Sequence, residues 1–301
     1  MQNFRLRVFH TVATHLSFSK AADLLFISQP AVTKNIKELE SEWDIRLFDR
    51  MKGRIFLTEA GKTAMEYATM ILQMHDKLEF ALSSLKNKFT GKLRLGASTT
   101  IGQYILPELL AKFNAIHPDV DISLVNANSQ QIESAILSKQ IDLGLVEGNI
   151  NNPQLKYIPF LDDEIVAVAS TSQPVSRHDE VTIETLKQIP VVLREDGSGS
   201  LEVISKKLLE KHISLNELRV VMHLGSTESI KSYIQHANCI GLVSIHSVHK
   251  ELISGNVKVI DITDLDIERA FHFVHLHGPL DGLGQLFMEF AQRSITNGYP
   301  L

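Results

Sequence analysis

Residues 17–58 have the sequence SFSKAADLLFISQPAVTKNIKELESEWDIRLFDRMKGRIFLT, and this stretch decides the fold of the first part of the chain. Ser17 or Ser19 can cap a short helix, because a serine oxygen accepts hydrogen bonds from the free amides of a first turn. Phe26 and Ile27 then interrupt the helical spacing of the apolar residues. The buried face of this helix is expected to consist of Ala21, Ala22, Leu24 and Leu25.

A second helix is predicted to begin after Ser28, with Pro30 in its first turn, where the missing amide hydrogen costs nothing. Its apolar face repeats at helical spacing through Ala31, Val32, Ile36 and Leu39. The opposite face carries Gln29, Thr33, Lys34 and Lys37. A recognition helix enters the major groove with its N-terminal residues against base edges, and lysines farther along meet phosphates. The spacing therefore predicts a helix-turn-helix that binds double-stranded DNA.

A basic hairpin is predicted to follow this helix. Gly53 permits a tight turn, so the chain around it can form a wing that grips the neighbouring DNA backbone. The basic residues of this segment are Arg46, Arg50, Lys52 and Arg54. The alternative interpretation is a small helical subdomain with a solvated charged face.

The charge distribution favours DNA over that alternative. Residues 1–58 carry nine Lys and Arg against six Asp and Glu, a formal charge of +3. The whole chain carries −5, which leaves −8 for residues 59–301. Only the first segment is therefore suited to a polyanion, and its modest excess indicates that two copies bind together.

Residues 59–90 contain a heptad pattern. The apolar positions are separated by gaps of alternately four and three residues, which is the 3.5-residue repeat of a coiled coil. They are Ala60, Ala64, Tyr67, Ile71, Met74, Leu78, Ala81 and Leu85. We expect a long linker helix that pairs with a second copy and forms a homodimer. The alternative is a long core helix within one domain.

The N-terminal 90 residues resemble the LysR-type transcriptional regulators. The resemblance rests on FRLRVFHTVATHLSFSKAADLLFISQPAVTKNIKELESEWDIRLFDR followed by FLTEAG. It implies that the matching positions Gln29, Pro30, Thr33, Lys34 and Lys37 lie at the DNA surface. The family usually has Gly after the recognition helix, whereas this chain has Asp44, which adopts a left-handed cap less easily than Gly.

Residues 91–301 show alternating strand-like and helical segments, which predicts an α/β unit with parallel strands and crossover helices. Strands are expected at 92–98, 121–127, 142–147, 164–169, 191–195, 219–223 and 239–244, and helices at 107–117, 129–139, 201–211 and 227–236. The fold class is thus mixed, with a winged helix-turn-helix at 1–58, a coiled-coil linker at 59–90 and a two-lobed effector domain at 91–301.

The family resemblance implies that this effector domain is similar to a periplasmic binding protein. Lobe 1 would then contain about 91–161 and 267–301, and lobe 2 about 162–266. Polar segments follow strands in both lobes, and ligands bind at such strand ends in open α/β sheets. The expected contacts of a small polar or anionic effector are Ser98, Thr99, Thr100, Asn128, Glu147, Arg194, Ser198, Ser200 and Thr227.

The segments GAS, REDGSGS and GST are similar to those of the sulfur-assimilation and carbon-fixation branch of the family. In that branch the loop commonly ends Gly-Thr-Arg, but here it ends Gly199, Ser200, Leu201. Arg194 could supply the missing positive charge, or it could pair with Glu195 or Asp196. An ordinary helix cap or turn is the alternative interpretation of each segment taken alone.

Other chemistries find little support in the sequence. There is no GxxxxGK[ST], HExxH or GxSxG motif, so an enzyme is not expected. The closely spaced histidines His272, His275 and His277 lack partners that would complete a metal site. Cys239 lies among apolar residues, which favours a small core residue over a sensor thiol. No cofactor is predicted, apart from a small-molecule co-inducer.

No apolar run is long enough to span a membrane, and the N-terminus lacks the apolar core of a signal peptide. We therefore expect a cytoplasmic protein without a membrane partner. The alternative function is a solute-binding protein, or a small-molecule sensor that does not bind DNA directly. The family resemblance further implies a homotetramer, with RNA polymerase as an additional partner.

Overall fold

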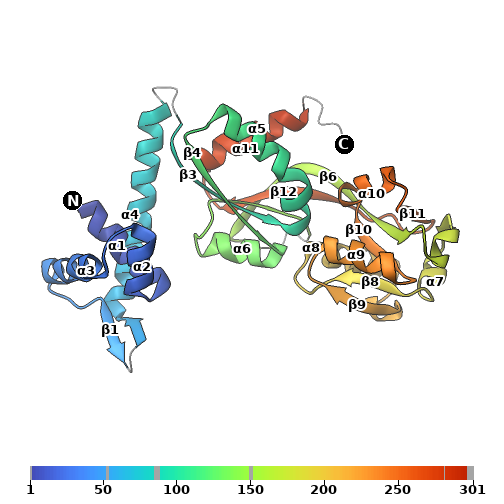
Figure 1. The fold of residues 1–301 in the computed structure, drawn as a ribbon, viewed down its shortest axis with the longest axis horizontal. Coiled ribbons are helices and arrows are strands. Elements are labelled where there is room, and N and C mark those ends of the chain that lie inside the picture. The colour runs from blue at the N-terminus through green and yellow to red at the C-terminus, as the bar shows by residue number, and fades with distance from the viewer. Residues whose placement is uncertain (1, 52–53, 85–88, 149–151, 281, 297–301) are drawn as a thin grey trace. The chain divides into compact units, whose positions relative to one another are not determined.

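The structure is a computed structural model of the 301-residue chain, and it describes residues 2–51, 54–84, 89–148, 152–280 and 282–296. The chain divides into two compact units, Met1–Asn87 and Lys88–Leu301 (Figure 1). The first is a winged helix-turn-helix with a long helix, and the second is an α/β unit with two lobes. The predicted fold class is thus confirmed. Among the described residues, no helix is both long and apolar enough to cross a membrane.

The first unit packs three helices and a hairpin around a small aromatic core. Phe48 lies 5.5 Å from Phe9 and 5.8 Å from Phe18, measured between ring centroids. The rings thereby attach the wing to the helices. The elements are α1 (Gln2–His15), α2 (Phe18–Leu25), α3 (Gln29–Trp43), β1 (Phe48–Met51), β2 (Arg54–Leu57) and α4 (Glu59–Ser84).

Local signals explain where these helices begin and end. Ser17 caps α2, and Ser28 caps α3 by accepting a hydrogen bond from the amide of Ala31. Phe26 ends α2 with φ of 54°, and Asp44 ends α3 with φ of 50°, so Asp44 adopts the predicted left-handed cap. The predicted burial of Leu24 was wrong, because its side chain is 49% exposed. Phe18, in the first turn of the same helix, is buried together with Ala21 and Ala22.

The long helix α4 has two distinct faces. The first two positions of the predicted seam, Ala60 and Ala64, pack against the core of the helix-turn-helix. The middle of the seam is exposed, with Tyr67, Ile71, Met74 and Leu78 between 53% and 65% accessible. The side chain of Ala81 and the whole of Leu85, which complete the predicted repeat, lie outside the described part.

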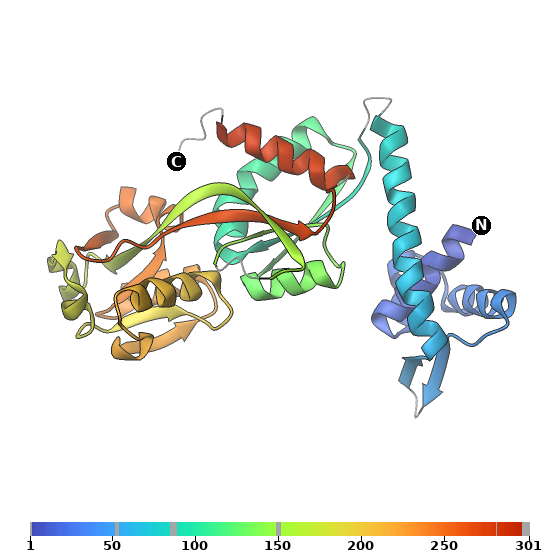
Figure 2. The same cartoon turned by 180° about the vertical axis from the view of Figure 1, so that it is seen from behind.

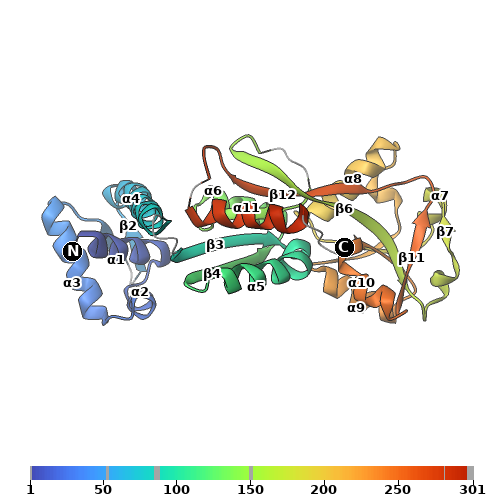
Figure 3. The ribbon, with the colours of Figure 1, turned by 90° about the horizontal axis from the view of Figure 1, so that it is seen from above.

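Lobe 1 of the second unit is a mixed sheet with helices on both faces. Its parallel strands β4, β3 and β5 are adjacent, and the antiparallel strand β12 follows β5. Helices α5 and α11 cover one face and α6 covers the other (Figures 1 and 3). The elements are β3 (Gly91–Ser98), α5 (Leu106–Ile116), β4 (Val120–Ala127), α6 (Ser129–Leu137), β5 (Leu143–Val146), β12 (Glu268–Leu276) and α11 (Gly282–Thr296).

Lobe 2 repeats this arrangement around its own apolar core. Strands β10, β8 and β9 are parallel neighbours, and β11 joins them through β6. The elements are β7 (Glu180–Val181), α7 (Ile183–Leu186), β8 (Val191–Arg194), α8 (Gly199–Glu210), β9 (Val220–Leu224), α9 (Thr227–His236), β10 (Ile240–Ser244), α10 (His249–Ile253) and β11 (Val257–Ile262). Short 3₁₀ turns occupy Pro174–Arg177, Leu215–Glu217 and Ile245–Ser247.

Two long strands connect the lobes. Strand β6 (Leu155–Ser170) runs antiparallel to β12, and both pass from one lobe to the other (Figure 2). The sequence predicted only the second half of β6, because Pro159 interrupts its apolar pattern. The structure accommodates Pro159 opposite His272, at an irregularity in the register. A second segment that the sequence did not predict is the π-helical turn Ile101–Ile105 before α5.

Candidate DNA-binding surface and inter-lobe site

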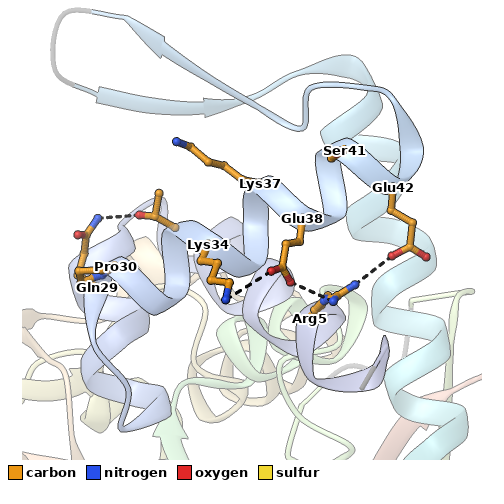
Figure 4. Close-up of a pocket in the computed structure, with 9 residues that line it drawn as sticks. Arg5, Gln29, Pro30, Lys34, Lys37, Glu38, Ser41 and Glu42 are labelled. Carbon is orange, nitrogen blue, oxygen red and sulfur yellow. Dashed lines mark hydrogen bonds and ion pairs between the residues drawn. The ribbon is translucent and has the colours of Figure 1, made fainter.

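The N-terminal half of α3 presents polar and basic side chains to the outside. Gln29 donates a hydrogen bond of 3.0 Å from Nε2 to Thr33 Oγ1, which holds both side chains on the exposed face. Lys34 and Lys37 follow along the same surface (Figure 4). A groove of about 830 Å³ runs over this region, lined by Arg5, Gln29, Pro30, Thr33, Lys34, Lys37, Glu38, Ser41 and Glu42.

An ionic chain that the sequence did not predict crosses the groove. Arg5 of α1 lies 3.0 Å from Glu38 and 3.3 Å from Glu42, and Glu38 lies 3.8 Å from Lys34 (Figure 4). The arginine compensates two carboxylates that would otherwise repel a phosphate backbone. Lys37 adds a further positive charge to this face, which therefore suits a polyanion although acids lie within it.

The wing follows the predicted plan in its backbone. Strands β1 and β2 pair in antiparallel register, with Arg50 opposite Ile55 and Met51 opposite Arg54. The side chains of Arg50 and Arg54 lie outside the described part of the structure, as do Lys52 and Gly53. Their contact with DNA stays a prediction.

In the second unit, two of the predicted effector residues contact the carboxylate of a third. Ser98 at the end of β3 donates to the carboxylate of Glu147, which follows β5, and Thr100 lies 3.4 Å from the other carboxylate oxygen. The neighbouring hydroxyl of Ser129 donates to the backbone carbonyl of Glu147 at 2.7 Å. The hydroxyls predicted to hold an effector thus surround a carboxylate of the chain itself.

The crossover strands add residues that the sequence did not select. Arg269 of β12 donates from Nε to Asp163 of β6 at 2.6 Å and from Nη1 to Ser200 of α8 at 2.9 Å. Its Nη1 also lies 3.9 Å from Glu147. Asp163 accepts a second hydrogen bond, of 2.6 Å, from Ser244. Arg269 therefore joins both lobes at their crossover, and no sequence motif marks it.

Other predicted residues have local roles. Asn128 caps α6 in a capping box with Gln131, and Ser198 caps α8. Thr227 is buried at the start of α9, and Thr99 is a half-buried residue whose Oγ1 has no hydrogen-bond partner among the described residues. These positions stay predicted effector contacts.

Arg194 resolves one alternative from the sequence. It is buried, and it donates to both carboxylate oxygens of Glu195 at 2.8 and 3.0 Å. Its partner is therefore Glu195 and not Asp196. Its Nη1 is buried without a hydrogen-bond partner among the described residues, so Arg194 stays a predicted effector contact.

A cleft of about 1,410 Å³ opens beside Arg269 and Asp163. Tyr104, from the π-helical turn of lobe 1, donates a hydrogen bond to Glu228 of lobe 2, and Lys231 lies 5.0 Å from the centre of the Tyr104 ring. Burial, followed by the nearby Glu228 carboxylate, raises the pKa of Tyr104 far above its ordinary value, so the hydroxyl stays protonated and donates. Polar contacts therefore join the lobes at a second place.

Two further predictions concern metal and thiol chemistry. Within the described residues, no group of three or more His, Cys, Asp and Glu side chains is arranged to hold a metal ion. Cys239 is a buried free cysteine packed among apolar side chains, and burial raises the pKa of its thiol. A raised pKa disfavours the reactive thiolate.

Each of the two units matches a known protein-family model. The model of the LysR substrate binding domain matches residues 86–295, and that of the bacterial regulatory helix-turn-helix protein, lysR family, matches residues 4–62. The chain belongs to the LysR family of transcriptional regulators. A probable RuBisCO transcriptional regulator of Phaeodactylum tricornutum is 32% identical to this chain, and the match covers 90% of this chain and 89% of the relative's length.

Solved structures resemble this LysR-family chain as well. The regulatory domain of CcmR from Synechocystis, in complex with 2-PG, is 28% identical with a TM-score of 0.63, and the match covers 69% of this chain and 99% of that one. Full-length CbnR complexed with its target DNA has a TM-score of 0.65 over 98% of this chain and 99% of that one. At 17% identity, the CbnR likeness concerns the fold alone.

Proposed function

We propose that this LysR-type regulator binds operator DNA through α3 and responds to a small polar or anionic molecule held between its lobes. The observation that carries the proposal is the exposed groove on α3. Gln29 and Thr33 would contact base edges in the major groove, and Lys34 and Lys37 would contact phosphates. The supporting DNA contacts would be Ser28, Pro30, Arg50 and Arg54.

The working form is proposed to be a homotetramer built from homodimers. The exposed apolar stripe on α4 supports pairing of this helix with a second copy. The strands at the two ends of the main sheet path, β4 and β9, carry exposed apolar side chains, among them Val125 and Met222. Because exposed edge strands with apolar residues invite pairing, we assign these edges to contacts between effector domains of different dimers.

The effector would act by shifting the population of two tetramer arrangements. This requires that it bind one arrangement more tightly than the other. Arg269 and the Tyr104–Glu228 pair both join the lobes, so a ligand that alters either contact would change how the lobes close. The altered tetramer would then bend DNA differently and present a different surface to RNA polymerase.

A solute-binding role without DNA is less well supported, because the chain carries a matched helix-turn-helix unit in addition to the effector domain. The relatives are named as transcriptional regulators, so we propose that the chain acts by binding and not by catalysis. Its proposed site of action is the cytoplasm.

Footprinting tests the role of α3. We expect Gln29→Ala to relax the preference for particular bases, because it removes an amide suited to base edges. Lys34→Ala should weaken binding at all sequences by a similar factor. Lys206→Ala removes the same charge from the exposed face of α8 and serves as the control. Unchanged protection and affinity in both α3 variants would contradict the assignment of this helix.

Calorimetry tests the inter-lobe site. Small molecules such as shikimate, which is bound by the effector domain of QuiR, would be screened against the full-length protein. Binding should weaken in Thr100→Val and Thr227→Val, which keep the side-chain volume and remove the hydroxyl. An exposed threonine of the linker helix, changed in Thr63→Val, is the control. Ligands that bind both cleft variants as tightly as the wild type would exclude these hydroxyls as contacts.

A further inference from the structure

We infer that the cleft beside Arg269 and Asp163 is a second binding site, which takes a lysine- or arginine-rich segment of a partner protein. The cleft is lined by parts of both lobes and by the crossover strands β6 and β12. Of the described residues that line it, none is one of the nine predicted effector contacts. The site is therefore separate from the effector site of the proposed function.

The size of the cleft suits a peptide better than a metabolite. Its volume is about 1,410 Å³, whereas sites for small molecules commonly measure about 300–1,000 Å³. The cleft extends from the π-helical turn of lobe 1 to α9 and α10 of lobe 2. Its apolar lining residues Ile105, Pro107 and Ile245 offer contacts for the methylene groups of long basic side chains. A segment bound across both lobes would favour one arrangement of the lobes over others.

The charge of the lining favours a cationic partner. Seven Asp and Glu side chains and three Lys and Arg side chains line the cleft, a formal charge of −4 with histidines neutral. Lys231 is already engaged, because its Nζ lies 2.8 Å from both Glu228 and Glu251. The same Nζ donates a hydrogen bond of 2.9 Å to the backbone carbonyl of Ser247. This lysine is therefore not free to compensate the acids of the crossover strands.

Three carboxylates on those strands lack a cation. They are Asp162, Glu164 and Glu268, and no ion pair joins them to a lysine or arginine in the part of the chain that the structure describes. Glu268 lies opposite Glu164 in the register of β12 and β6, and like charges in that position repel each other. Partial burial, followed by the carboxylates of Asp266 and Glu268, raises the pKa of Glu164. A cationic group bound at these strands would relieve the repulsion.

The spacing of the acids matches an extended peptide. Asp162 and Glu164 are exposed, whereas Asp163 between them is buried, so the two exposed residues lie on the same side of β6. Residues two apart in a strand are separated by about 6.6 Å. Alternate side chains of an extended peptide have the same repeat. Lysines at every second position would therefore each meet one carboxylate.

A buried donor without an acceptor points to a peptide backbone. The side chain of Arg269 is 3% exposed and lines the cleft, and its Nη2 has no hydrogen-bond partner among the described residues. Its other nitrogens donate to Asp163 and Ser200. A cationic group cannot satisfy Nη2, whereas a carbonyl oxygen of a peptide can accept from it. The site thus combines acids for basic side chains with a donor for the backbone that carries them.

Fluorescence anisotropy of a labelled peptide of alternating lysine and alanine, titrated with the full-length protein, tests the site. The wild type should bind this peptide saturably and should not bind the analogue with glutamine in place of lysine. Glu164→Gln combined with Glu268→Gln keeps the side-chain shapes and removes two charges, so affinity should fall about two- to 30-fold. Both residues are exposed, so the variant should fold, which a thermal scan would check. The control combines Asp119→Asn with Asp121→Asn, two exposed acids outside the cleft, and should bind as the wild type.

Free spermine, which has ammonium groups but no acceptor oxygen, should displace the peptide only at much higher concentration. Arg269→Lys keeps the charge and removes Nη2, so it should weaken peptide binding as well. Displacement by spermine at concentrations equal to the peptide's would assign the cleft to a free polyamine and overturn the inference. An unchanged affinity in the crossover-strand variant, or an equal loss in the control variant, would also overturn it. DNA footprinting is independent of these titrations, so failure of the proposed function is recognised separately.

Discussion

The exposed stripe on α4 leads to a quantitative prediction about dimerisation. Ile71 lies in the middle of the stripe and is 53% exposed in the single chain. Complete burial of an isoleucine stabilises by about 1.5–3 kcal/mol, so covering this exposed half contributes about 1–1.5 kcal/mol per chain. Ile71→Lys removes this stabilisation from both chains of a dimer, so the free energy of dimerisation should weaken by about 2–3 kcal/mol. The dimer dissociation constant should therefore rise roughly 30- to 150-fold.

Sedimentation velocity over a range of protein concentrations measures this shift. Lysine has a higher helix propensity than isoleucine, so α4 itself should stay folded in this variant. Circular dichroism would check this. Glu66→Lys places the same residue on another exposed face of α4 and is the matched control. Equal dissociation constants for Ile71→Lys and the wild type would refute the assignment of this stripe as the dimer seam.

Two further predictions concern stability. Gly61→Ala should lower the free energy of unfolding of the first unit by about 1–3 kcal/mol, although alanine favours helix, because the added Cβ would lie 2.1 Å from the backbone oxygen of Leu47. Gly225→Ala, with nothing within 4 Å, is the control in the same thermal scans. Burial lowers the pKa of His272 and His275, so the unfolded chain binds more protons below about pH 6.5, and stability should fall as the pH drops through that range. Replacing both histidines with glutamine should reduce this loss between pH 7.5 and 5.5, and an unchanged loss would contradict it.

The helix-turn-helix could be predicted from sequence because its signals are local. The serine caps, Pro30 in the first turn of α3 and the spacing of Val32, Ile36 and Leu39 act within one or two helical turns. The burial of Leu24 was predicted wrongly because it too was inferred from local spacing alone. Helical spacing identifies an apolar stripe, but only the packing of the other helices determines which edge of the stripe is buried.

The inter-lobe site was only partly predictable. Strand-end motifs predicted that Ser98, Thr100 and Glu147 contact one effector, and the structure brings these three side chains together. Their hydrogen bonds to one another could not be foreseen, because Glu147 is 49 residues from Ser98. Arg269 had no local signal at all, and only the pairing of β6 with β12 brings it to Asp163.

On the DNA-binding surface, the ion pairs of Arg5 could not be predicted from sequence either. It lies 37 residues from Glu42, and the contact depends on how α1 crosses α3. A count of charges in the sequence gives the net excess of the unit, whereas the structure shows which acids an arginine compensates. The positive character of the α3 face depends on that compensation.

The most direct test of the account is genomic footprinting of the wild-type protein, followed by affinity measurements at one bound site across a range of salt concentrations. We predict discrete sites, each with two half-sites about 34–36 Å or a multiple apart. Lys34→Ala should weaken binding and reduce the slope of log affinity against log salt by about 0.9 for each phosphate that is no longer neutralised. Absence of bound sites, or an unchanged affinity and salt dependence in Lys34→Ala, would contradict the claim that α3 binds operator DNA.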